Sequence, residues 1–393
     1  MKESFIVSHP TGNTFVGAIL KELFKRDQLK VFFTTIGFGQ DSSFKNLGRR
    51  TYSIPDKLID RQILKELLRI SGLVKGNHIK TIATVDKIYK MIDRKVSVKL
   101  EKEMPDVIHS YEDCSYQTFI RAKELGIKCS YELPIAYWST NRKLMSEEAE
   151  RYPHWASTLE TLEEPEEKLV RKEEELVLAD YVTCPSEFVL KSIPYEIRKK
   201  TPCQIAYFGS PNLKPIPTWV KEKKKGFKLL FVGSMSQRKG LADLFEAMKH
   251  LSNIHVTLSI LGQPSMPMEF YRKQFAEFKY FPPCSNEKVR EIMTNHDILI
   301  LPSIAEGRAL VQQEALSCGL PIIVTPNAGG EDLVTEGKTG HIVPIRSPLK
   351  IAEKIVELIE DDITKEDRVE ICQRKSAEYS WKNYSQKIIS ISK

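Results

Sequence analysis

Two short stretches in the second half of the chain bring charged side chains to strand-to-helix turns. In FVGSMSQRKGLADLFEAM, an apolar run ends at Gly233, and Arg238 and Lys239 then precede a helical pattern. Backbone N–H groups and the positive terminus of a helix attract anions at such a turn. Arg supplies a planar fork of donors and Lys a compact charge, which together suit a diphosphate. A pair of solvated turn residues is the alternative interpretation, although cations at this end oppose the helix dipole.

The second stretch, ILILPSIAEGRALVQQEALSCGLPIIVTPNAGG, contains two carboxylates. Glu306 lies in a loop after a buried strand, and Glu314 follows in the next helix. Such a pair could accept hydrogen bonds from sugar hydroxyls at the two ends of a long ligand. The amides of Ala309, Leu310 and Val311 lie at the expected helix start, where they could meet a phosphate. Either carboxylate alone would be interpreted as a solvated charge.

These motifs lie in a chain that alternates short apolar strands with amphipathic helices, which predicts α/β domains with parallel sheets covered on both faces. The expected strands are Ser4–Ser8, Lys30–Thr35, Val107–His109, Lys128–Tyr131, Tyr181–Cys184, Lys228–Val232, His255–Leu261, Ile298–Leu301, Pro321–Thr325 and His341–Val343. Helical periodicity is found at Arg61–Val74, Leu241–Leu251, Val289–Met293 and Ile351–Ile359. Such doubly wound sheets bind ligands at the carboxyl ends of their strands.

A change of composition predicts a domain boundary. Residues 207–226 are rich in proline and lysine, as linkers are, and an apolar strand follows directly. We therefore expect an N-terminal Rossmann-like domain at residues 1–206, a linker at residues 207–226 and a C-terminal Rossmann-like domain at residues 227–376.

Length and composition exclude several classes of protein. The chain has 393 residues, of which 41% are hydrophobic, so it can form two sizeable cores. Its seven cysteines show no CxxC spacing, which favours a reducing compartment over a disulfide framework or a zinc site. We see neither a secretory signal nor a run of about 20 apolar residues. The sequence predicts a cytoplasmic protein.

The net charge of +7 is unevenly distributed along the chain. Between Lys57 and Glu103 there are 12 Lys and Arg against 6 Asp and Glu. No zinc-finger spacing or RNA-binding aromatic signature accompanies this basic stretch, so nucleic acid is not an expected partner. An anionic membrane surface at the inner face, a phosphorylated acceptor and a solvated helix face all remain open.

The second half resembles the retaining glycosyltransferases of family 4, which adopt the GT-B fold. The resemblance rests on FVGSMSQRKGLADLFEAM, on the Glu306–Glu314 pair with its spacing of eight, and on CGLPIIVTPNAGGEDLVTEGKTGHIVP. The closing SAEYSWKNYSQKI is similar to that family's final helices. The first half matches only in broad pattern. The resemblance implies two Rossmann-like domains facing across a cleft, with the final helix (residues 377–393) packing back on the N-terminal domain.

The resemblance also implies roles for individual residues. Arg238 and Lys239 would hold the donor diphosphate and stabilise it as a leaving group, Glu306 would lie near the donor sugar, and Glu314 would bind the ribose. The expected donor-site set is Gly233, Ser234, Arg238, Lys239, Phe281, Pro282, Glu306, Arg308, Ala309, Leu310, Val311 and Glu314. The chain has no Asp-x-Asp. This fits a site without a metal or other cofactor, where cationic side chains neutralise the diphosphate.

The acceptor side is less well marked. The expected residues there are Gly12, Asn13, His109 and Glu132, with Trp138, Tyr152 and Trp155 as further aromatic candidates. A simple turn at Gly12–Asn13, a structural role for His109 and core packing of the aromatics are the alternative interpretations.

We therefore expect a retaining transferase that moves a sugar from a nucleotide diphosphate sugar to a hydroxyl of a glycan, a lipid-linked molecule or a small molecule, as in the synthesis of cell-surface polysaccharide. A non-catalytic nucleotide-sugar-binding module and a nucleotide-sugar epimerase of the same fold are the alternatives. Base, sugar, acceptor, linkage and oligomeric state are left open.

Overall fold

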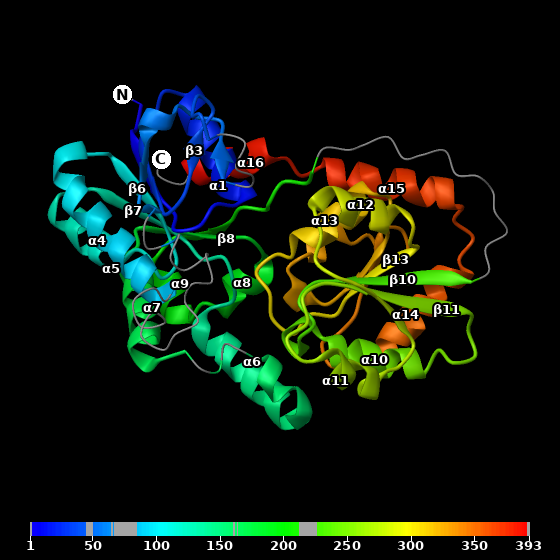
Figure 1. The fold of residues 1–393 in the computed structure, drawn as a ribbon. Helices are drawn as coiled ribbons and strands as arrows, with labels where there is room; N and C mark the ends of the chain where they lie inside the picture. Colours follow the sequence, from blue (N-terminus) through cyan, green and yellow to red (C-terminus); the bar gives the residue numbers. More distant parts are fainter. Residues whose placement is uncertain are drawn as a thin grey trace.

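The computed structural model describes residues 2–44, 50–63, 66, 85–159, 162, 164–211 and 226–390. They form two α/β domains, one on the left of Figure 1 and one on the right. The strands of the two sheets fall on either side of the predicted linker, of which residues 212–225 lie outside the described part. Most of the helix predicted at Arg61–Val74 also lies outside it, and Arg61 itself ends a strand.

The N-terminal domain is built on a parallel sheet. Among the described residues, its strands are ordered β5-β2-β1-β6-β7-β8-β9, so the order reverses between β1 and β6. The bounds are β1 (Phe5–Ser8), β2 (Leu29–Thr34), β5 (Ile59–Arg61), β6 (Val107–Tyr111), β7 (Lys128–Glu132), β8 (Tyr181–Cys184) and β9 (Cys203–Ile205). A small pair, β3 (Phe38–Gly39) and β4 (Thr51–Tyr52), lies outside this sheet.

The C-terminal domain is built on a second parallel sheet. Its described strands are ordered β12-β11-β10-β13-β14-β15, the order found in dinucleotide-binding folds, with the reversal between β10 and β13. The bounds are β10 (Phe227–Val232), β11 (Val256–Leu261), β12 (Phe278–Phe281), β13 (Ile298–Leu301), β14 (Ile322–Val324) and β15 (Gly340–Ile342). The strands predicted from sequence are confirmed within two residues at each end, whereas β3, β4, β5, β9 and β12 were not predicted.

Helices cover both faces of each sheet. Because side chains alternate along a strand, Ile6 packs with α4 and α5, whereas Phe5 and Val7 pack with α1. The helices of the first half are α1 (Thr14–Lys25), α4 (Val85–Glu103), α5 (Tyr116–Glu124), α6 (Trp138–Arg151), α7 (Glu166–Leu178), α8 (Glu187–Ser192) and α9 (Tyr195–Lys200). Those of the second half are α10 (Leu241–Lys249), α11 (Met268–Gln274), α12 (Asn286–Thr294), α13 (Leu310–Ser317), α14 (Pro348–Glu360), α15 (Lys365–Ala377) and α16 (Trp381–Ser390).

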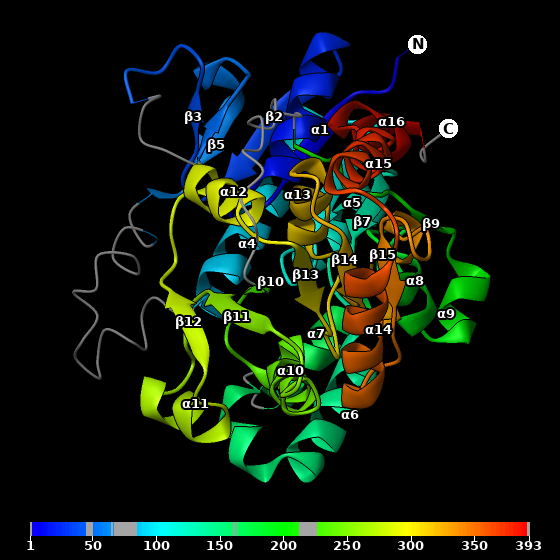
Figure 2. The same ribbon diagram turned by 90° about the vertical axis from the view of Figure 1, so that its right-hand side faces the viewer.

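The chain returns to the N-terminal domain at its end. After α15, the segment at Tyr379 leads into α16, which lies beside α1 in both ribbon views (Figures 1 and 2). Tyr384, Ile388 and Ile389 of α16 are buried in the core that α1 forms with the sheet. The predicted return of the C-terminal helix is therefore confirmed.

One segment of the first half packs with the second domain. Helix α6 and the 3-10 turn η2 (Pro153–Thr158) extend from the N-terminal domain towards α10 (Figure 1), and we call residues 138–158 the arm. Trp155, in η2, is 2% exposed and belongs to the core of the C-terminal domain. The start of the arm still contacts the N-terminal half, because Trp138 packs on its core and the Thr140 hydroxyl donates to the Ser192 carbonyl at 3.1 Å. The prediction that residues 1–206 form one domain is wrong for the end of the arm, where Arg151 and Trp155 contact the C-terminal half.

None of the described helices has both the length and the hydrophobicity needed to cross a membrane.

Candidate active site

The basic turn follows β10 at the carboxyl edge of the C-terminal sheet. Gln237, Arg238 and Lys239 form a single 3-10 turn, η4, and Gly240 is the N-cap of α10, which follows. Gly240 has a φ of +74°, and a Cβ atom there would lie 2.0 Å from the carbonyl oxygen of Pro302. Only glycine therefore allows the turn to lie against the end of β13. Both motifs found in the sequence thus meet where the strand order reverses.

The two predicted cations converge on Glu306. Lys239 Nζ lies 2.5 Å from Glu306 Oε1, and Arg238 Nη1 donates to the same carboxylate oxygen. Arg238 Nη1 also donates to the carbonyl of Ala305 at 3.0 Å, and the amide of Ile304 donates to the Arg238 carbonyl at 2.9 Å. The loops after β10 and β13 are therefore bonded together through both backbone and side chains.

Burial and charge act in opposite directions on this cluster. Burial lowers the pKa of Lys239 below its usual value, and the charge of Arg238 lowers it further, although Glu306 partly opposes both. Burial alone would raise the pKa of Glu306, but Lys239 and Arg238 together hold it below its usual value. The carboxylate is therefore ionised at neutral pH, and the two cations with one carboxylate leave one positive charge for a ligand.

The start of α13 supplies backbone donors beside this charge. The helix begins at Leu310, so the N–H groups of Leu310 and Val311 belong to a first turn that has no acceptors within the helix. Ala309 is the residue before it, and its amide donates to the Ala328 carbonyl at 3.3 Å. The prediction that Ala309 offers its amide to a ligand is therefore wrong. Glu314 is half-buried in the middle of α13.

Arg308 has a structural role rather than the predicted donor contact. Its side chain is fully buried, and its Nη1 and Nη2 donate to the two carboxylate oxygens of Asp332 at 2.7 and 2.9 Å. Its guanidinium lies over the rings of Tyr207 and Tyr379, 4.7 and 5.2 Å from their centroids. These tyrosines belong to the two segments that cross between the domains. The donors of Arg308 are therefore used within the protein.

The remaining predicted donor residues lie along the same edge of the sheet. Gly233 follows β10, and its amide donates to the Leu261 carbonyl at 3.0 Å. Ser234 is half-buried, with its hydroxyl 3.3 Å from that of Ser236. Phe281 ends β12, and the exposed Pro282 follows it. The structure thus brings the ends of β10, β11 and β12 together beside the basic turn.

On the acceptor side, the loop after β1 is compact. Asn13 caps α1, because its Oδ1 accepts from the Val16 amide at 3.0 Å. A Cβ atom on Gly12 would lie 2.4 Å from the hydroxyl of Tyr52. Gly12 and Asn13 therefore hold the loop at the carboxyl end of β1, and a contact with an acceptor stays a prediction.

His109 and Glu132 do not face the other domain as predicted. His109 is 2% and Glu132 4% exposed. His109 Nδ1 lies 3.0 Å from the Ser130 hydroxyl, and the Tyr384 hydroxyl donates to Glu132 Oε1 at 2.6 Å. Strand alternation places both residues on the face covered by α1 and α16, so an acceptor cannot reach them in this arrangement.

His9 is a residue that the sequence analysis missed. It follows β1 directly, stacks on Tyr111 with 4.1 Å between ring centroids, and accepts from the Thr11 amide at 3.1 Å. Burial and the nearby His109 lower the pKa of His9 to about 3, so it is neutral at physiological pH. Its place at the carboxyl end of the first strand, next to the reversal of strand order, is a signal that could have indicated it.

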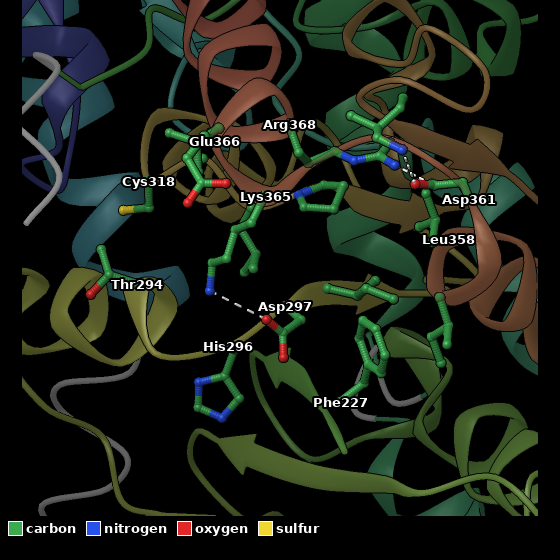
Figure 3. Close-up of a pocket in the computed structure, with 17 residues that line it drawn as sticks. Phe227, Thr294, His296, Asp297, Cys318, Leu358, Asp361, Lys365, Glu366 and Arg368 are labelled. Atoms are coloured by element: carbon green, nitrogen blue, oxygen red, sulfur yellow. Dashed lines mark hydrogen bonds and ion pairs between the residues drawn. The ribbon is translucent and has the colours of Figure 1, made fainter. Parts of the chain in front are cut away.

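A separate cavity of about 420 Å³ lies at the opposite, amino edge of the C-terminal sheet (Figure 3). Phe227 begins β10 there, and both cations of the wall pair with carboxylates: Lys365 Nζ lies 3.4 Å from Asp297, and Arg368 pairs with Asp361. Glu366 adds a further carboxylate to the wall, so the cavity has no surplus of positive charge and is less suited to an anion than the edge that holds Arg238 and Lys239.

Comparisons with known proteins agree with this geometry. Residues 217–375 match the family model of the glycosyl transferases group 1. A D-inositol 3-phosphate glycosyltransferase of Paenarthrobacter aurescens is 26% identical over 166 residues, which cover 39% of this chain and 41% of that protein. The match to this and similar curated relatives covers less than two thirds of their length.

Solved structures match over the whole chain. Sucrose-phosphate synthase from Thermosynechococcus elongatus has a TM-score of 0.64 at 14% identity, with 99% of this chain and 98% of that chain covered. Anabaena HepE in complex with UDP and glucose has a TM-score of 0.60 at 15% identity, with 99% of each chain covered. The fold is therefore GT-B, as the sequence predicts. The match of residues 217–375 to the glycosyl transferases group 1 confirms the predicted resemblance of the second half to family 4.

Proposed function

We propose that the protein is a glycosyltransferase that transfers a sugar from a nucleotide diphosphate sugar to a hydroxyl acceptor, with retention of the anomeric configuration. One observation carries the proposal. Arg238 and Lys239 converge at the reversal of strand order, beside the first turn of α13, where a diphosphate would meet two cations and free backbone donors. The similar structure of HepE is a complex with UDP and glucose, which is consistent with a donor of this class.

The charges act on the leaving group. As the bond between the anomeric carbon and the diphosphate oxygen breaks, negative charge grows on that oxygen, and preorganised cations stabilise it. The acceptor oxygen forms the new bond to the anomeric carbon on the same face, and its proton passes to the departing phosphate. Glu306 holds the two cations in place before the donor arrives. No metal is required in this scheme, and no other cofactor takes part.

The first experiment is a thermal-shift panel of uridine, guanosine and adenosine diphosphates and their sugars. A ligand at 100 times its Kd raises the stability of the fold by about 2.7 kcal/mol. One base should give a clear shift in the wild type. If none of the ligands shifts the unfolding temperature, the proposal is wrong.

The second experiment measures turnover by release of the nucleotide diphosphate. Arg238→Ala and Lys239→Ala should each lower the rate by about 10²–10³-fold, as the loss of an oxyanion donor does. Lys249→Ala is the matched control, because Lys249 lies at the far end of α10, which follows the basic turn, is half exposed and pairs with Glu246 at 2.6 Å. A chain that binds a donor sugar and releases no nucleotide with any acceptor would instead be a binding module.

A further inference from the structure

The arm reaches the basic turn through the side chain of Gln237. Gln237 is fully buried, and its Nε2 donates to Glu148 Oε2 of the arm at 2.6 Å and to Asp243 Oδ2 of α10 at 2.9 Å. Its Oε1 accepts from the Ala242 amide at 2.9 Å. The backbone amide of Gln237 donates to the hydroxyl of Thr158, also in the arm, at 3.1 Å. Both the backbone and the side chain of this residue are therefore fixed.

Two arginines compensate the carboxylates around Gln237. Arg151 Nη2 lies 2.6 Å from Asp243 Oδ1, and Arg346 Nε donates to Glu148. Glu148 and Asp243 are both fully buried. Buried carboxylates are tolerated when cations and hydrogen-bond donors satisfy them, and here two arginines and the Gln237 amide satisfy both acids. Arg346 also pairs with the more exposed Glu147, 2.9 Å away.

The basic turn is held from two sides. Within the turn η4, the backbone bonds are those of Lys239 to Ser236 at 3.1 Å and Gly240 to Gln237 at 2.8 Å. On one side the loop after β13 donates to the Arg238 carbonyl, and on the other the arm holds Gln237. Arg238 and Lys239 follow Gln237 directly, so any movement of Gln237 moves both cations. Catalysis by fixed charges depends on their being held in place before the reaction.

We infer that the arm is part of the donor site, and that Glu148, Thr158 and Gln237 are positioning residues for Arg238 and Lys239. This inference rests on the proposed function. Contacts from the N-terminal half would thereby set the diphosphate affinity of the C-terminal domain. A purely structural network would lower the stability of the fold and leave the diphosphate affinity of the folded protein unchanged, so the two roles differ in what they predict.

The test compares uridine, guanosine and adenosine diphosphates with the corresponding nucleosides in the full chain. Gln237→Met keeps the length of the side chain and removes its hydrogen bonds. We expect at least a tenfold loss of affinity, by calorimetry, for the diphosphate that the wild type binds, and less than a twofold change for the nucleoside, by saturation-transfer NMR. Ser157→Ala is the matched control, because Ser157 joins the arm to Met266 at 3.2 Å without touching the turn.

Two further variants test the same positioning role in case Gln237→Met does not fold. Thr158→Val removes the acceptor of the Gln237 amide, together with the bond from the Thr158 hydroxyl to the Trp155 carbonyl inside the arm. We expect a several-fold loss of diphosphate affinity. Gln237→Glu should weaken diphosphate binding, because it places a third carboxylate beside those of Glu148 and Asp243. Adding Glu148→Gln restores one amide–carboxylate pair between positions 237 and 148. The double variant should therefore recover at least half of the lost binding free energy.

The outcomes separate the two proposals. A wild type that binds none of the diphosphates refutes the proposed function. A wild type that binds, together with a folded Gln237→Met or Thr158→Val that binds equally well, leaves the function intact and refutes the positioning role. An equal loss of nucleoside and diphosphate affinity also refutes it, because the effect then lies outside the phosphate site.

Discussion

The contact between Gly307 and Pro134 offers a direct test of how closely the domains must approach. Gly307 follows Glu306 in the C-terminal domain, and Pro134 follows β7 in the N-terminal domain. A Cβ atom on Gly307 would lie 1.7 Å from the carbonyl oxygen of Pro134. Both atoms belong to backbone or would be fixed to it, so no side-chain rotation relieves the clash. We predict that Gly307→Ala separates the two domains at this point.

The size of the effect follows from the distances. Ordinary contact begins at 3.4 Å, so the 1.7 Å approach requires a shift of 3.4 − 1.7 = 1.7 Å. The Ser186 hydroxyl donates to the Gly307 carbonyl at 2.6 Å, and this bond across the domains would be stretched or broken. A misplacement of about 1 Å can lower a catalysed rate by about 10²-fold. We therefore expect kcat/KM to fall by about 10–100-fold.

The assay is nucleotide release with the donor identified by the thermal-shift panel. Ser186→Ala is the control, because it removes the hydrogen bond without adding a clash, and its kcat/KM should fall less than tenfold. Near-native unfolding temperatures for both variants would show that the domains themselves are intact. If Gly307→Ala keeps kcat/KM within twofold of the wild type, the closed contact is irrelevant to turnover and the reasoning is wrong.

Three further predictions concern single side chains. Burial lowers the pKa of Lys239, and only its protonated form can hold a diphosphate. In a pH–rate profile, kcat/KM should therefore decline on the alkaline side at a pH below the usual lysine range. Lys239→Arg should move this decline to higher pH. Arg308→Lys cannot form the two-pronged pair with Asp332 and should lower the free energy of unfolding by about 2–3 kcal/mol in a denaturant titration. Tyr384→Phe leaves buried Glu132 without its 2.6 Å donor and should cost about 1–3 kcal/mol in the same measurement.

The donor half of the site could be predicted from the sequence because its signals are local. Gly240 permits the turn, Arg238 and Lys239 are neighbours in the chain, and Glu306 follows an apolar strand. Parallel sheets bring the carboxyl ends of successive strands to one edge, so the strand order alone brings the basic turn to Glu306. The strands β5, β9 and β12 were missed because their sequences, IDR, CQI and FKYF, are interrupted by polar residues and so contain no continuous apolar run.

The roles of Arg308 and His109 could not be read from the sequence, because their partners are distant in the chain. Arg308 lies over Tyr207 and Tyr379, which come from the two crossing segments on either side of the C-terminal domain. His109 lies beside Glu132, which the final helix covers through Tyr384. A buried polar residue on a strand looks the same in sequence whether it faces a ligand or a returning helix.

The arm shows why a boundary in sequence differs from a boundary in packing. The chain passes between the domains near residue 207, as composition predicts. Trp155, far before that point, nevertheless lies in the C-terminal core, with 6.0 Å between its ring centroid and that of Phe245. Glu148 and Thr158 hold the basic turn from outside its own half. Any opening of the domains that leaves α6 straight must therefore break either the bond from the Thr140 hydroxyl to the N-terminal half or the contacts of Glu148 and Thr158 with the basic turn. Only the second loosens the support of the two cations.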